Sequence, residues 1–122
     1  MSQPITIEDL LRNLARYDRS ENARKFRQKL KCDLPPSQCL MLHLIDEGQV
    51  VHPVDHLCAA RMLVHHKGMC YNVQGSGKAA NGKPVIVCRL TDKGEEAARE
   101  VRAVAQAIVD RINEKTRKGV LA

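Results

Sequence analysis

Aromatic side chains are scarce in this sequence. They make up 2% of the 122 residues, as Tyr17, Phe26 and Tyr71, and there is no tryptophan. Proteins that bind single-stranded nucleic acid usually stack bases on several aromatic rings, so this composition disfavours that class. The core must therefore consist mainly of Leu, Val, Ile, Met and Ala side chains.

Long apolar runs and export signals are also missing. No run of about 18 apolar residues occurs, so we expect no transmembrane helix and no membrane partner. Residues Met1–Pro4 lack the basic and apolar regions of a secretory signal. Without such a signal, cysteines are normally reduced, and the five present have no regular spacing. We therefore expect a cytoplasmic protein without disulfides.

Catalytic motifs are absent as well. The sequence has no Gly-x-Ser-x-Gly, no Walker loop and no His-Glu-x-x-His. Gly75–Lys78 lacks the spacing of a phosphate loop, and its expected position in a hairpin provides no helix N-terminus to stabilise a phosphate. We therefore expect no enzyme activity and no cofactor.

Positive charge is abundant. Lys and Arg number 20 against 14 Asp and Glu, which gives a net charge of +6 at pH 7 and an isoelectric point near 9.3. Residues Arg12–Lys31 contain eight basic and two acidic residues, and Arg61–Lys93 contain six and one. Such segments attract phosphates, although a run of charge can also be an ordinary solvated face. A polyanionic partner is therefore a reasonable hypothesis.

Hydrophobic spacing predicts that the first half is helical. Thr6–Asp9 has the pattern of a capping box, and the N-terminal helical region spans 6–31, either as one bent helix or as two with Ser20 capping the second. Prolines end this region, and Pro36 begins a helix that ends at Gly48. A short extended piece at 49–51 and a middle helix, Pro53–Lys67, follow.

The hydrophobic period changes after Gly68, which we expect to terminate the middle helix. Residues 69–73 and 85–90 are rich in β-branched side chains and predict two strands joined by a glycine-rich loop over 74–84. The last helix spans 91–118, with Thr91 or Asp92 as its cap and a continuous apolar stripe. The chain therefore predicts a single domain over 1–122.

The order of these elements is that of a winged-helix domain. Leu90–Gly94 matches a Leu-Thr-x-x-Gly pattern, and Leu34–Leu42 is similar to the start of a DNA-binding helical unit. On these segments the chain resembles the MarR-like transcription regulators over residues 34–112. The resemblance implies an α+β, mainly helical fold: a winged-helix core over 34–90 with a two-stranded wing, and flanking N- and C-terminal dimerisation helices.

The helix-turn-helix is shortened relative to that family. Only residues 49–67 are available for two helices, which normally need roughly 25 residues with their turns. By resemblance, the middle helix would then take the recognition role. It contains a single Arg and no Asn or Gln, so we expect mainly electrostatic affinity and modest discrimination between DNA sequences.

Seven basic residues are the candidate contacts to duplex DNA. They lie at the end of the middle helix and on the wing: Arg61, His65, His66, Lys67, Lys78, Lys83 and Arg89. Phosphates attract such groups, and released counterions add affinity. The alternative is that the first four are cations favoured at a helix C-terminus, and that the others are ordinary surface residues.

Pairing of two copies is expected through the terminal helices, because their apolar stripe exceeds what one small domain needs. The candidate dimerisation residues are Leu10, Leu14, Val101, Val104, Ile108 and Ile112. Two-fold pairing presents two wings to two half-sites of DNA. We therefore predict a homodimeric DNA-binding transcriptional regulator.

Three alternatives stay open. A winged helix can be a protein-interaction module, such as an adaptor or an inhibitor of a nucleic-acid enzyme, without specific DNA binding. His52, His56 and Cys58 raise the question of zinc, although we expect no metal because no Cys-x-x-Cys pair accompanies them. Cys32, beside Lys31, is the cysteine best placed to be a reactive redox sensor.

Overall fold

The chain is described by a computed structural model, which covers residues 4–48, 64–78, 82 and 84–121. It is a mainly helical α+β protein with one two-stranded antiparallel sheet, as predicted. The expected extended piece at 49–51, most of the middle helix, the zinc candidates, Arg61 and Lys83 lie outside the described residues.

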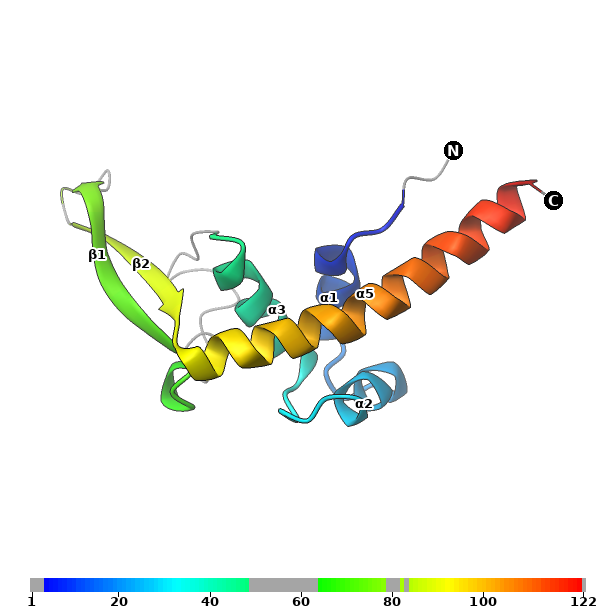
Figure 1. Cartoon of the computed structure of the whole chain (residues 1–122), viewed down its shortest axis with the longest axis horizontal. Helices are drawn as coiled ribbons and strands as arrows, with labels where there is room; N and C mark the ends of the chain where they lie inside the picture. Colours follow the sequence, from blue (N-terminus) through cyan, green and yellow to red (C-terminus); the bar gives the residue numbers. More distant parts are fainter. Residues whose placement is uncertain (1–3, 49–63, 79–81, 83, 122) are drawn as a thin grey trace.

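A long C-terminal helix organises the molecule (Figure 1). This helix, α5 (Asp92–Leu121), is about 45 Å long at 1.5 Å per residue. Shorter helices gather beside it, and the β-hairpin projects from the end where α5 begins (Figure 1). The shorter helices are α1 (Ile7–Ala15), α2 (Glu21–Gln28) and α3 (Pro36–Asp46), and the hairpin consists of β1 (Cys70–Lys78) and β2 (Pro84–Leu90).

The N-terminal region forms two helices rather than one bent helix. The Thr6 side chain accepts from the Asp9 amide at 3.1 Å, and the Asp9 carboxylate accepts from the Thr6 amide at 3.0 Å, which is the predicted capping box. The Ser20 hydroxyl caps α2 by accepting from the Ala23 amide at 3.2 Å. Each helix thus has its own start signal, and the turn at 16–20 separates them.

The third helix is the centre of the core. Pro36 stands at its first turn, where a missing amide hydrogen costs nothing. Every residue from Gln38 to Ile45 is buried, on all sides of the helix. Packing of these side chains stabilises α3, since fully burying one Leu contributes about 1.5–3 kcal/mol to the free energy of unfolding.

The middle helix ends as predicted, at Gly68. Residues 64–66 are helical, and Gly68 has a φ of +73°. The Met69 amide donates to the Val64 carbonyl and the Gly68 amide to the His65 carbonyl, both at 3.0 Å. These two bonds form a Schellman motif, in which glycine is favoured because its φ is positive.

The hairpin is longer than the sequence predicts. Residues 74–78 were expected in the loop over 74–84, but they belong to β1, with Gln74 opposite Ile86 and Lys78 opposite Pro84. The register shifts between these two pairs, and Gly77 has a φ of +82° there. Pairing with β2 therefore holds residues 74–78 in a strand although their intrinsic β-propensity is low. Gly77, with its positive φ, accommodates the shift in register.

Two of the predicted dimerisation residues are already used inside the chain. Leu10 and Val101 are 9% and 0% exposed and belong to the core between α1, α3 and α5. Both side chains therefore pack inside their own chain, and their part in a contact with a second copy stays a prediction. Leu14, Val104 and Ile108 are half-buried, and Ile112 is 37% exposed.

Candidate nucleic-acid interface

The base of the hairpin is fixed by the Leu90–Gly94 segment. The Thr91 amide donates to the Met69 carbonyl at 3.0 Å, and the Thr91 hydroxyl donates to the Gly68 carbonyl at 2.6 Å. The same hydroxyl accepts from the Gly94 amide at 3.2 Å and so caps α5, as predicted. One threonine thus connects the middle helix, the hairpin and α5.

Gly94 is required by this junction. A Cβ atom there would clash with the Met69 carbonyl oxygen and press on the Leu90 side chain. The helix α5 can therefore approach the backbone at Met69 only with glycine at this position. The Leu-Thr-x-x-Gly pattern has a local physical reason: threonine supplies the cap and the cross-link, and glycine permits the close approach.

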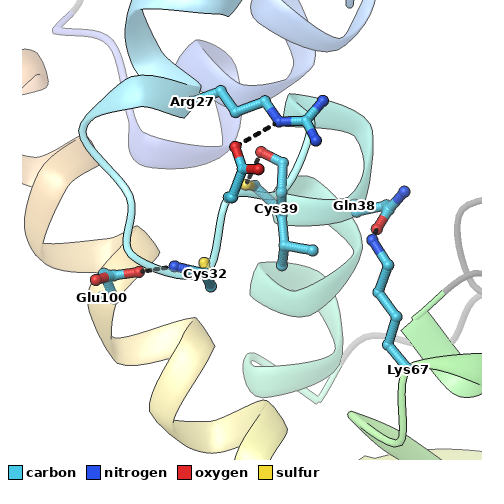
Figure 2. A network of polar contacts seen from close by, with 8 residues as sticks. Arg27, Cys32, Gln38, Cys39, Lys67 and Glu100 are labelled. Atoms are coloured by element: carbon cyan, nitrogen blue, oxygen red, sulfur yellow. Dashed lines mark hydrogen bonds and ion pairs between the residues drawn. The ribbon is translucent and has the colours of Figure 1, made fainter.

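Lysine side chains reinforce the same junction. The Lys67 ammonium donates to the Gln38 side-chain oxygen at 2.6 Å, as Figure 2 shows, and Lys93 donates to the Lys67 carbonyl at 3.0 Å. Gln38 is 5% exposed, so this bond holds the end of the middle helix against α3. An ammonium has three donors, and Lys67, which is exposed, keeps two for other partners.

The predicted contact residues that the structure describes are all exposed: His65, His66, Lys67, Lys78 and Arg89. The rings of His65 and His66 lie edge to face, 6.3 Å apart. No ion pair within the described part of the chain involves Lys78 or Arg89. Their charges are therefore available to an external anion.

These residues follow the hairpin rather than converging on one point. Arg89 lies opposite Tyr71 near the base, whereas Lys78 lies seven residues further along β1. At about 3.3 Å per strand residue, the two positions are roughly 20 Å apart. The arrangement suits several contacts along a polyanion better than the enclosure of one small anion.

Cys32 does not have the surroundings of a reactive thiol. Burial and the nearby Glu100 carboxylate raise the pKa of its thiol to about 12. Figure 2 shows the Cys32 amide pointing at Glu100, with which it forms a 2.9 Å hydrogen bond. A redox sensor needs a thiol with a depressed pKa, so burial and the Glu100 carboxylate of α5 argue against the alternative that rested on the neighbouring Lys31.

Metal ligands do not gather in the part of the chain that the structure describes, where no group of three His, Cys, Asp or Glu could hold an ion. The zinc candidates His52, His56 and Cys58 lie outside it. Within the described part of the chain, no helix is long and apolar enough to cross a membrane.

Sequence reasoning missed three polar connections. Gln38 anchors Lys67; Asp18 accepts from the amide and hydroxyl of Ser37; and the Asn113 side chain bonds the backbone of Ile5. The partners are 19 to 108 residues apart in the chain, so no local pattern indicates them.

Comparisons with protein-family models, with curated proteins and with solved structures found no match. The MarR-like resemblance therefore stays a prediction, and the function has to be argued from the geometry.

Proposed function

We propose that this chain is a winged-helix DNA-binding protein that acts as a transcriptional regulator. It contacts duplex DNA through the β-hairpin and the C-terminal end of the middle helix. The observation that carries the proposal is the projecting hairpin, which presents Lys78 and Arg89 exposed and without ion pairs to any other described residue. The Leu90–Gly94 junction supports it, because a firmly anchored hairpin presents these charges at a constant position.

The hairpin contributes mainly phosphate contacts. Lys and Arg side chains spread over about 20 Å match a row of phosphates along a duplex better than one base pair. Affinity of this kind arises from released counterions and falls steeply with salt. We therefore expect binding to weaken strongly between about 50 and 200 mM salt, with less than roughly 10⁴-fold preference for any one DNA site.

Charge reversal tests the proposal. Binding of a fluorescein-labelled duplex of random sequence is measured by anisotropy at several salt concentrations. Lys78→Glu combined with Arg89→Glu should weaken binding at least ten-fold and flatten its salt dependence. Lys115→Glu combined with Arg117→Glu changes the net charge equally at exposed positions near the C-terminus and serves as the matched control.

The proposal fails if the duplex does not bind at low salt, or if the control pair weakens binding as much as the hairpin pair. A preference above 10⁴-fold for one site at physiological salt overturns the electrostatic account instead, because it requires base readout. Circular dichroism of each variant verifies that the fold is retained.

Dimerisation is a separate part of this proposal. Leu14, Val104, Ile108 and Ile112 are the predicted residues with accessible surface left for a second copy. Light scattering at tens of micromolar protein measures the oligomeric state. A strict monomer would exclude a dimer that presents two wings, but it would still allow one hairpin to contact DNA.

A protein-interaction module is the second candidate function. It is favoured by a groove with apolar side chains between α1, α2 and the second half of α5. These helices lie away from the hairpin (Figure 1). Such a module predicts no binding to random duplex even at low salt, which the anisotropy experiment detects directly.

A further inference from the structure

The groove lies between α1, α2 and the second half of α5, and has a volume of about 510 Å³. Its floor is apolar, with side chains from all three helices and from the turn after α1: Leu10, Leu14, Tyr17, Phe26, Ile108 and Ile112. Three large hydrophobic side chains are exposed in the described chain, and two of them, Tyr17 at 69% and Ile112 at 37%, line this groove.

The charged residues that line the groove are all positive. They are Lys25 from α2, Lys29 at the C-cap of α2 and Arg111 from α5, and no carboxylate is among the lining residues. Asn13, Ser20 and Asn22 complete the polar edge. An occupant that satisfies both features must present apolar side chains to the floor and negative charge to the edge.

A second copy of this chain does not have that combination where it is accessible. The part of α5 that continues past the groove carries exposed Lys115 and Arg117 against one carboxylate, Glu114, so a positive edge repels it on balance. The acidic first part of α5, Asp92–Glu100, has its apolar side buried already through Ala97 and Ala98. Charge complementarity therefore points to a different partner.

We propose that this groove binds an acidic amphipathic helix of a partner protein. Its apolar side chains, spaced three or four residues apart, contact Leu14, Ile108 and Ile112, while its carboxylates lie near Lys25, Lys29 and Arg111. The inference does not rest on DNA binding, because the helices α1 and α2 that line the groove lie away from the hairpin, beside a later part of α5 (Figure 1). The hairpin and the groove can be occupied at once. A partner helix in the groove and a second copy held through Leu14, Ile108 and Ile112 exclude each other.

A designed peptide is the probe. It is an amidated 16-residue helix with Leu at helical spacing, Glu on the remaining face and one Trp. The protein has no tryptophan, so emission excited at 295 nm reports on the peptide alone. We expect a dissociation constant on the order of 10 μM that weakens with salt. Two control peptides carry the same residues with scrambled spacing, or Lys in place of Glu, and both should bind at least ten-fold more weakly.

Variants locate the peptide on the protein. Lys25→Glu combined with Lys29→Glu, and separately Ile112→Glu, should each weaken binding of the acidic peptide at least ten-fold. The matched control is Lys78→Glu combined with Arg89→Glu, which makes the same charge change on the hairpin and should leave peptide binding unchanged. Circular dichroism verifies the fold of all three variants.

Several outcomes overturn the proposal. One is no binding of the acidic peptide, and another is equal binding of the Lys peptide. A third is a dimer by light scattering that Ile112→Glu dissociates, which assigns the groove to a second copy. A fourth is a pair of results: the native chain does not bind the peptide, and the Lys25 and Lys29 variant loses binding to duplex DNA. That pair assigns the positive edge of the groove to nucleic acid. Failure of the DNA proposal alone leaves the peptide result intact.

Discussion

Cys32 and Glu100 illustrate how tertiary contacts set the chemistry of single residues. Burial alone raises the pKa of the Glu100 carboxyl, but hydrogen bonds from Cys32 and from the Lys31 backbone, together with the Lys31 charge, outweigh it, and the net shift is downward. The same carboxylate, together with burial, raises the pKa of the Cys32 thiol to about 12. The pair therefore keeps the carboxylate charged and the thiol protonated.

We predict that Cys32 resists alkylation near neutral pH. A thiol with a pKa of about 12 forms very little thiolate below pH 9, and the thiolate is the nucleophile. Iodoacetamide labelling between pH 7 and 10, followed by peptide mass spectrometry, measures the rate at this residue. It should be at least ten-fold below the rate of the same cysteine in urea.

Glu100→Gln is the informative variant for this pair. Removal of the negative charge should lower the pKa of the Cys32 thiol and speed its labelling. Native labelling as fast as in urea contradicts the structural account, because it requires an exposed thiol with an ordinary pKa.

At the scale of elements, the junction between the hairpin and α5 combines a cap with a close approach. Thr91 serves as a cap for α5 and as a link to Gly68, and Gly94 allows the helix to pass the Met69 carbonyl. The hairpin therefore depends on two residues that lie just outside it.

We predict that Gly94→Ala destabilises the protein by about 1–3 kcal/mol. In an unconstrained helix this change would stabilise instead, by roughly 0.4–1 kcal/mol. Here the added Cβ clashes with backbone, which must move. Urea unfolding followed by circular dichroism measures the difference. Ala103→Gly, at an exposed position of the same helix, measures how much helix propensity alone changes the free energy of unfolding. A stabilising Gly94→Ala would show that the approach at Met69 is looser than described.

At the scale of the whole molecule, α5 connects two surfaces of different character. The hairpin at its start carries exposed cations, and the groove along its second half combines apolar and positive side chains. The N-terminal segment closes against the same half of α5, where the Asn113 side chain accepts from the Ile5 amide at 2.9 Å and donates to its carbonyl at 3.1 Å.

We predict that Asn113→Ala destabilises the protein by about 1–2 kcal/mol, because two part-buried hydrogen bonds to Ile5 are lost. Urea unfolding measures the change. Gln106→Ala removes an exposed bond to Asp110 on the same helix and should cost no more than about 0.5 kcal/mol. Equal effects of the two variants would contradict a structural role for the tie between the chain ends.

Local signals account for most of the elements that could be predicted. Thr6, Ser20 and Thr91 cap helices, and Gly68 ends one, as their sequence neighbourhoods indicate. The prediction failed where pairing extends a strand through the glycine-rich 74–78 segment, whose own propensity is low. At Leu10 and Val101 the sequence could not show that the chain's own core covers these side chains, because an apolar stripe does not indicate what packs on it.

The sequence by itself determined the helical character, the caps and the excess of positive charge, because these follow from the residues and their near neighbours. Only the tertiary structure decided that Glu100 faces Cys32, that Gln38 holds Lys67, and that Ile112 lies in a groove with a positive edge. Such contacts join residues distant in the chain, and their existence depends on how the helices pack. Capping and propensity act over a few residues and carry no information about that packing.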